Sequence, residues 1–186
     1  MVHDNPRPRR DAKRTRSAIL EAAQEAFSIK GYSEAGVREI TAAAGVNPAL
    51  VNRYFGSKER LYEAALSALL DAQLITNIPR EEFGGAVVSM LTADQRNRRN
   101  PLPMMMLASA DPTARAITVR LLKEIFLAPL AHWYGAENGA GKAACFAVLA
   151  SGLTVYHEVY PLAALGSEMR DKTRDWLIAC FQSLMD

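Results

Sequence analysis

The chain has 186 residues, of which 49% are hydrophobic and 23% are charged. These proportions are typical of a globular protein and exclude a wholly disordered chain, a collagen-like fibre and a low-complexity scaffold. Cys145 and Cys180 are too few for a disulfide framework and lack the spacing of a zinc site, so we expect no metal and no cofactor. Neither an apolar secretory signal nor a run of 18 apolar residues is visible, which favours a cytoplasmic protein and no membrane partner.

The net charge of +2 is distributed unevenly along the chain. Residues 1–60 hold 11 Lys and Arg against 7 Asp and Glu, whereas residues 61–186 hold 11 against 13. A basic N-terminus is typical of a polyanion-binding chain, and equally of a solvated tail. We expect residues 1–14 to form a disordered basic arm, because prolines and charges dominate there. Its basic residues are Arg7, Arg9, Arg10, Lys13 and Arg14.

Apolar residues recur at helical spacing along nearly the whole chain, and no strand pattern of useful length is visible. The sequence therefore predicts an all-α fold. Gly31, Gly45 and Gly56 end three helices in its first third, and Pro129 is expected to kink a later one. The helix near residue 150 is apolar nearly all round and should be buried on every side. The predicted helices cover residues 15–31, 36–44, 48–55, 57–75, 81–98, 112–134, 141–160 and 167–184.

Two short helices, separated by Gly45-Val46-Asn47 and preceded by a longer one, predict a three-helix helix-turn-helix. The second short helix has only about two turns and is too short to be stable alone. Its apolar residues should pack inward, while Ala49, Asn52 and Arg53 face outward with Pro48. Asn reads adenine and Arg reads guanine in the major groove. The alternative is an ordinary short surface helix with a capped turn.

Residues 15–66 resemble the DNA-binding domain of the tetracycline-repressor (TetR/AcrR) family. The resemblance rests on Ala23 and Phe27, Gly31-Tyr32, Val37-Arg38-x-Ile40, Ala44-Gly45-Val46, Tyr54-Phe55-Gly56-Ser57-Lys58-Glu59 and Leu61. It implies a helix-turn-helix DNA-binding domain over residues 15–60. Residues 61–186 are then expected to form a helical effector-binding and dimerisation domain.

The resemblance also implies a function and a set of DNA contacts. The expected protein is a repressor, not an enzyme, that binds a palindromic operator as a homodimer and is released by a small apolar effector. Tyr54 and Lys58 match phosphate-contacting positions, and Arg38 matches a position that reaches DNA. Together with the outward face of the short helix, the expected DNA-binding residues are Arg38, Asn47, Pro48, Ala49, Asn52, Arg53, Tyr54 and Lys58.

The chain departs from the family pattern at two places. Ala35 and Gly36 stand where Thr or Ser usually caps the second helix, so that cap is missing unless Ser33 substitutes. Val51-Asn52 replaces the usual Leu-Tyr, so that a tyrosine contact is lost and Asn52 reads a base instead. These departures bear on the operator sequence rather than on DNA binding itself.

The C-terminal part offers candidate residues for the effector and for a second chain, and each has a structural alternative. Aromatic and methionine side chains enclose apolar ligands, but they also fill helical cores. The candidate effector residues are Met105, Phe126, Trp133, Tyr156 and His157. The candidate dimer residues, on the last two helices, are Leu149, Leu153, Trp176, Cys180 and Phe181.

Two other functions remain as alternatives to a DNA-binding regulator. One is a helical small-molecule-binding or interaction protein with no role on DNA. The other is a small helical enzyme, for which the sequence shows no G-x-S-x-G, H-E-x-x-H or P-loop motif.

Overall fold

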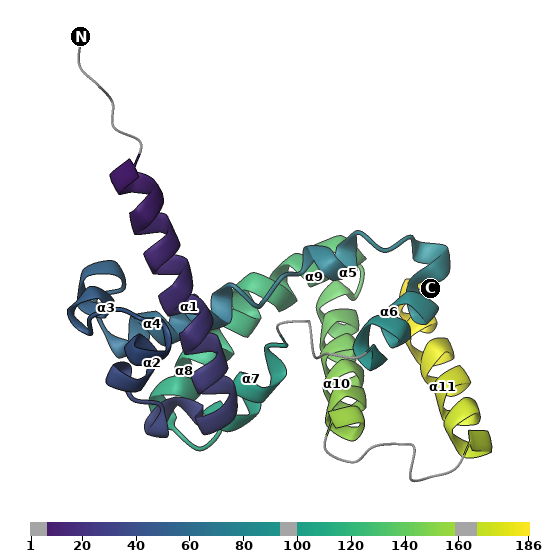
Figure 1. Cartoon of the computed structure of the whole chain (residues 1–186). Coiled ribbons are helices and arrows are strands. Elements are labelled where there is room, and N and C mark those ends of the chain that lie inside the picture. The colour runs from purple at the N-terminus through teal and green to yellow at the C-terminus, as the bar shows by residue number, and fades with distance from the viewer. Residues whose placement is uncertain (1–6, 94–99, 159–166) are drawn as a thin grey trace. The chain divides into compact units, whose positions relative to one another are not determined.

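The computed structural model describes residues 7–93, 100–158 and 167–186, in which every regular element is helical and no strand occurs (Figure 1). The all-α prediction is confirmed. The helices are α1 (Arg7–Glu34), α2 (Val37–Ala43), α3 (Ala49–Tyr54), α4 (Lys58–Ser67), α5 (Gln73–Thr76), α6 (Phe83–Thr92), α7 (Leu102–Ala108), α8 (Pro112–Leu121), α9 (Ala128–Tyr134), α10 (Gly139–Glu158) and α11 (Ser167–Gln182). Short 3-10 turns lie at Arg80–Glu82 and Ser183–Met185, and a π-helical segment spans Leu122–Leu127.

The chain divides into two compact units. Unit 1 comprises Met1–Leu69 and Pro101–Leu121, and unit 2 comprises Leu70–Asn100 and Leu122–Asp186. This division differs from the expected boundary at residue 60, because α7 and α8 pack with the N-terminal helices. The hydroxyls of Tyr62 on α4 and Thr118 on α8, both buried, lie 2.9 Å apart and join these elements. Arg120 on α8 adds an ion pair of 2.7 Å with Glu63 on α4.

Several elements differ from their predicted bounds. Helix α1 begins at Arg7, so part of the segment expected to be disordered is helical, and residues 1–6 lie outside the described residues. Helix α7 was not predicted, since Pro101 and Pro103 suggested only a restart of the chain. Proline is compatible with the first turn of a helix, and Pro103 occupies that position. Pro129, where the sequence predicts a kink, lies in the first turn of α9, directly after the π-helical segment.

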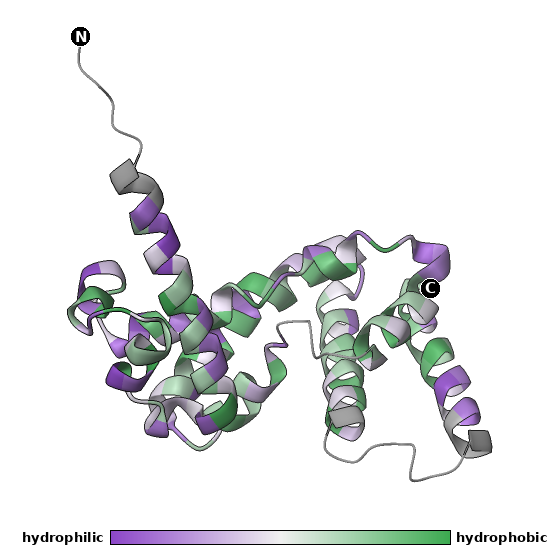
Figure 2. Ribbon diagram, in the orientation of Figure 1, coloured by the Kyte–Doolittle hydropathy of each residue, from purple (hydrophilic) through white to green (hydrophobic). Residues whose placement is uncertain are grey.

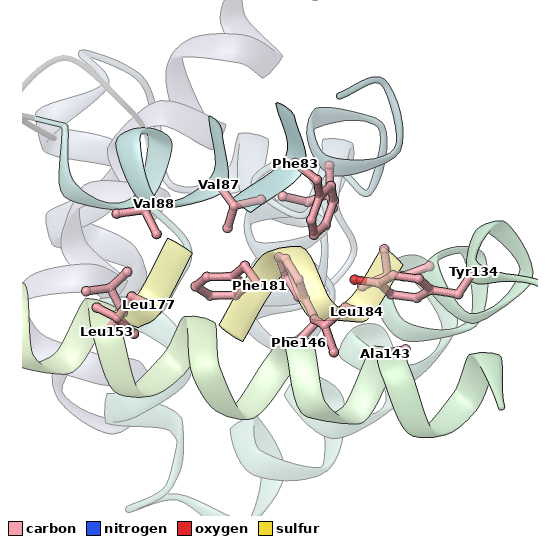
Figure 3. Packing of buried hydrophobic residues seen from close by; sticks show 12 residues of the cluster. Phe83, Val87, Val88, Tyr134, Ala143, Phe146, Leu153, Leu177, Phe181 and Leu184 are labelled. Carbon is pink, nitrogen blue, oxygen red and sulfur yellow. The ribbon is translucent and has the colours of Figure 1, made fainter. Parts of the chain in front are cut away.

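Unit 2 is organised around an apolar cluster that α6, α9, α10 and α11 share, together with α5 and the C-terminal turn (Figure 3). Phe146 of α10 and Phe181 of α11 are fully buried, with ring centroids 5.5 Å apart. Gly84 allows α6 to approach α11 closely, because a Cβ there would lie 2.3 Å from the Ile178 carbonyl oxygen. The cluster comprises Ile75, Phe83, Val87, Val88, Leu130, Tyr134, Ala143, Phe146, Leu153, Leu177, Phe181 and Leu184.

Helix α10 is apolar on most of its sides (Figure 2). Its stretch Gly139–Tyr156 has a mean hydropathy of 1.2 over 18 residues, and 28% of that stretch is buried. By length and composition alone it could cross a membrane, which is weak evidence because core helices share these properties. The expectation that α10 is buried on every side is wrong, since Val148 is 73% exposed and Tyr156 is 54% exposed.

Candidate nucleic-acid interface

A small apolar core holds the first four helices of unit 1 together. Helix α1 contributes Phe27, whose ring packs edge-on against Tyr62 of α4 with centroids 5.1 Å apart. Because α3 has only six residues, it depends on this core for its stability. One face of each helix supplies fully buried side chains: Ile19, Ala23, Phe27, Ile40, Val51, Leu61 and Leu66.

The turn between α2 and α3 is built from local backbone chemistry. Gly45 has φ 66°, a left-handed conformation in which glycine is favoured, and its N–H donates to the Ala42 carbonyl. The chain then reverses, and the Val46 N–H donates 2.9 Å to the Thr41 carbonyl. The Asn47 side-chain oxygen accepts from the Ala49 N–H at 2.9 Å, which closes the turn just before α3. Helix α3 begins at Ala49, one residue after the predicted start.

Helix α3 buries one side and exposes the other. Val51 is fully buried and Phe55 nearly so, as the sequence predicts. The predicted DNA-facing residues of the helix and the turn before it, Asn47, Pro48, Ala49, Asn52 and Arg53, are all exposed, and Tyr54 is half-buried. Small Ala49 at the first turn leaves the helix free to approach another surface closely. The exposed face therefore carries an amide and a guanidinium, the two groups that discriminate bases in the major groove.

The junction between α3 and α4 repeats the same turn chemistry. Gly56 has φ 87°, and the Ser57 hydroxyl accepts from the Arg60 N–H at 3.2 Å, capping α4. Helix α2, in contrast, begins after Gly36 without a side-chain cap. Ser33 does not substitute, because its hydroxyl donates to the Asp111 carboxylate at 2.7 Å. The missing cap that the sequence predicts is therefore confirmed.

Lys58 lies in a polar cluster at the start of α4 and is not a free cation. Its ammonium sits 4.7 Å from the ring centroid of Tyr32 and 3.4 Å from the Ser33 carbonyl oxygen. The Tyr32 hydroxyl donates to the Glu59 carboxylate at 3.0 Å. Burial, followed by this hydrogen bond and by the charges of Glu59 and Asp111, raises the pKa of Tyr32 to about 12. A phosphate contact by Lys58 would have to compete with these partners.

The acidic groups of this cluster remain ionised. Hydrogen bonds from the Ser57 hydroxyl, the backbone and the Tyr32 hydroxyl lower the pKa of Glu59. The Ala114 N–H, followed by the Ser33 hydroxyl, lowers the pKa of Asp111, which caps α8. The single positive charge of Lys58 faces two carboxylates, so the cluster is net negative and any affinity for phosphate must come from other cations.

Those other cations stand on α1, α2 and α3. Arg38 on α2 and Arg53 on α3 are exposed, as are Lys13 and Arg14 on the first turns of α1. The side chains of Arg7, Arg9 and Arg10 lie outside the described residues. Sequence reasoning did not assign a role to Arg16, whose guanidinium lies 4.9 Å above the ring of Phe55. This contact joins α1 to the end of α3 across 39 residues of sequence, and no local signal predicts it.

The predicted effector residues lie in different environments. Phe126 and Trp133 are partly buried against the apolar cluster of unit 2, whereas Tyr156 is 54% exposed. Met105 belongs to unit 1, and the side chain of His157 lies outside the described residues. The predicted effector set therefore stays a prediction.

The predicted dimer residues are divided between the core and the surface. Leu153 and Phe181 are buried in the core of unit 2 and offer nothing to a second chain, so these two assignments are wrong. Leu149 and Cys180 are partly buried, and Trp176 is 59% exposed. A strip of α10 that sequence reasoning missed is exposed instead: Ala144, Cys145, Val148, Ser151, Gly152 and Tyr156.

Comparison with known proteins identifies the family. Residues 19–65 match the model of bacterial regulatory proteins of the tetR family, and residues 81–185 match the tetracyclin repressor-like C-terminal domain. The chain belongs to the TetR family. Members of this family are transcriptional regulators, not enzymes, which confirms the resemblance seen in the sequence.

Relatives with curated names match only part of this TetR-family chain. The regulator BetI of Rhizobium meliloti is 34% identical over 88 residues, 43% of each chain. The repressor NicS of Pseudomonas putida is 40% identical over 55 residues, 30% of this chain and 26% of its own. The chain thus spans less than half of the length of these relatives.

Solved structures share the fold over most of the chain. A TetR-family regulator from Rhodococcus sp. superposes with a TM-score of 0.67 at 19% identity, covering 94% of this chain and all of the other. NalD of Pseudomonas aeruginosa, a repressor of the MexAB-OprM multidrug efflux pump, superposes with a TM-score of 0.57 at 19% identity, covering 79% and 85%. At these identities the likeness concerns the fold.

Proposed function

We propose that this chain is a DNA-binding transcriptional repressor of the cytoplasm, which binds a palindromic operator as a homodimer and is released by a small apolar effector. The observation that carries the proposal is the exposed face of α3, held between the two left-handed glycines Gly45 and Gly56. A short helix on such rigid turns projects its side chains from a fixed base, as entry into a major groove requires.

We assign base recognition to α3, and affinity for the phosphate backbone to the cations around it. Asn52 and Arg53 are exposed and carry the hydrogen-bonding groups that distinguish adenine and guanine. Arg38, Lys13 and Arg14 are exposed and neutralise phosphates, which strengthens binding to any sequence. Because Lys58 is engaged with Tyr32 and the Ser33 carbonyl, it ranks below these cations as a phosphate contact.

A second copy of the chain is the proposed occupant of the exposed apolar surfaces of α10 and α11. Val148 on α10 and Trp176 on α11 are 73% and 59% exposed, which is unfavourable for side chains of this kind in water. Small residues flank Val148 along the same strip of α10, so that another helix could approach closely. A two-fold dimer would place two α3 helices about 34 Å or a multiple of it apart on DNA, which requires an inverted-repeat operator.

Release by an effector requires a path from unit 2 to α4, and α8 provides it. Its Thr118 and Arg120 contact Tyr62 and Glu63 on α4, the helix that follows the DNA-reading turn. The chain runs without a loop from α8 into the π-helical segment and α9 of unit 2. An effector that favours a different state of this segment would shift the population away from DNA binding.

Selection of bound duplexes from a random pool tests the proposal. We expect the enriched sequences to contain an inverted repeat, and binding to the best of them to weaken steeply with salt. A helical small-molecule-binding protein without a role on DNA would enrich no sequence. That result, obtained with a folded and dimeric preparation, would contradict the proposal.

A further inference from the structure

Tyr134, the last residue of α9, buries a hydroxyl group inside the apolar cluster of unit 2. The residue is 7% exposed, and among the described residues no donor or acceptor pairs with its oxygen. Figure 3 shows the oxygen on the side of the ring that faces the other labelled members of the cluster. The side chains of the other buried members of the cluster are apolar and offer this oxygen no partner. Buried polar groups are nearly always paired, and this exception calls for a partner.

The hydroxyl is a neutral donor. Burial raises the pKa of Tyr134 above its usual range, and the positive charge of Arg80 only partly opposes this effect. The guanidinium of Arg80 is itself occupied, because it lies 5.0 Å above the Trp133 ring and donates to the Trp133 carbonyl at 3.1 Å. The Tyr134 O–H is thus a buried donor without a partner among the described residues, and it requires an acceptor atom.

The surroundings of the hydroxyl are aromatic. The ring centroid of Tyr134 lies 5.1 Å from that of Trp133 and 6.3 Å from that of Phe83, in tilted and edge-on arrangements. Aromatic pairs favour offset and edge-on contacts, so an aromatic ligand is the kind of molecule that would pack against these rings. Phe126 and Trp133 are only partly buried and cover the cluster. Phe126 belongs to the π-helical segment, a rare conformation that is frequent at functional sites.

We propose that the effector is a neutral aromatic compound with one hydrogen-bond acceptor, such as a ketone, ether or ester oxygen, that binds in this cluster and accepts from the Tyr134 hydroxyl. This inference rests on the proposed effector-released regulator and adds the chemical class of the effector. Entry of the effector displaces the side chain of Phe126 or Trp133. Because Phe126 belongs to the π-helical segment that follows α8, its displacement changes the conformation of that segment. A hydrophobic ring without an acceptor would leave the hydroxyl unpaired and bind more weakly.

Two probes of equal shape test the proposal. Acetophenone carries a carbonyl oxygen where α-methylstyrene carries a methylene group. Dissociation constants from ligand-observed NMR are compared for the wild type, Tyr134→Phe and the control Tyr32→Phe, whose hydroxyl lies in unit 1. We expect the wild type and the control to bind acetophenone about five- to twentyfold more tightly than α-methylstyrene, and Tyr134→Phe to bind both equally.

The melting temperature without a probe provides a second readout. Tyr134→Phe should melt at or above the temperature of the wild type, because the unpaired oxygen is removed and the ring is kept. A lower melting temperature would show that the hydroxyl already has a partner, such as a buried water, and would overturn the proposal. Equal affinities for the two probes in the wild type, no binding of either, or an acetophenone preference that survives in Tyr134→Phe would also overturn it.

DNA binding separates this inference from the proposed function. If the wild type binds its selected duplex but does not discriminate between the probes, the effector class is wrong and the regulator stands. If the probes are discriminated through Tyr134 but no duplex is bound, the site stands and the regulatory function fails.

Discussion

Replacement of Gly84 by alanine should destabilise the protein, although alanine is the better helix former. A Cβ at this position would lie 2.3 Å from the Ile178 carbonyl oxygen and 3.0 Å from both the Cβ and the backbone nitrogen of Gln182. The carbonyl belongs to the backbone of α11 and cannot turn aside, so the two helices must separate by about 0.7 Å to reach even a 3.0 Å contact. Overpacking of this kind costs about 1–3 kcal/mol, and the separation also weakens the hydrogen bond from the Gly84 N–H to the Gln182 side chain.

Gly85 provides a matched control on the same helix. A Cβ there meets no described atom within 4 Å, so alanine gains helix propensity without a clash. We expect Gly85→Ala to raise the free energy of unfolding by up to about 1 kcal/mol. Thermal unfolding followed by circular dichroism should then show Gly84→Ala melting about 2–10 °C below the wild type and Gly85→Ala at or slightly above it. Two variants that shift together would refute the assigned packing of α6 on α11.

The remaining predictions concern the dimer, the basic helix start and the polar cluster. Trp176→Asp should leave the protomer folded but lose about 3 kcal/mol or more of association free energy, so that sedimentation shows monomers at micromolar concentration; a persistent dimer would place the interface elsewhere. Changing Lys13 and Arg14 together to Ala should lower the salt slope of DNA binding by about 0.9 for each lost phosphate contact, and an unchanged slope would exclude α1 from the interface. Because the pKa of Tyr32 is raised from 10.0 to about 12 on folding, its contribution to the free energy of unfolding is complete below pH 10 and is lost as the pH rises toward 12. The melting temperature of the wild type should therefore fall more steeply between pH 10 and pH 12 than that of Tyr32→Phe, and parallel curves would contradict the raised pKa.

The helix-turn-helix could be predicted from the sequence because its determinants are local. Gly45, Asn47 and the Gly56-Ser57 pair fix turns and caps within four residues of themselves, so each leaves a readable signal. Their exposed and buried neighbours follow from helical periodicity alone. The outward face of α3 was accordingly predicted correctly.

Contacts between distant segments could not be predicted in this way. The pairing of Tyr62 with Thr118 spans 56 residues. It helps to place α8 in unit 1, although α8 lies well beyond residue 60, where the sequence predicts the end of the DNA-binding domain. The family resemblance implies a phosphate contact for Lys58, whereas its contact with Tyr32 becomes visible only in the folded unit. In the same way, the sequence of an apolar helix indicates that its surface must be buried, but not whether the same chain or a second one buries a given residue. Leu153, predicted to face a second chain, is buried within its own chain.

The most direct test of the account is the ratio of affinities for the selected operator and for a scrambled duplex of equal length, measured by fluorescence anisotropy at one salt concentration. The account predicts a ratio of about 10³ or more for the wild type. In Asn52→Ala this ratio should fall at least about tenfold, while the affinity for the scrambled duplex stays unchanged. A ratio near one in the wild type, or a ratio unaffected by Asn52→Ala and Arg53→Ala together, would contradict the claim that α3 reads the DNA sequence.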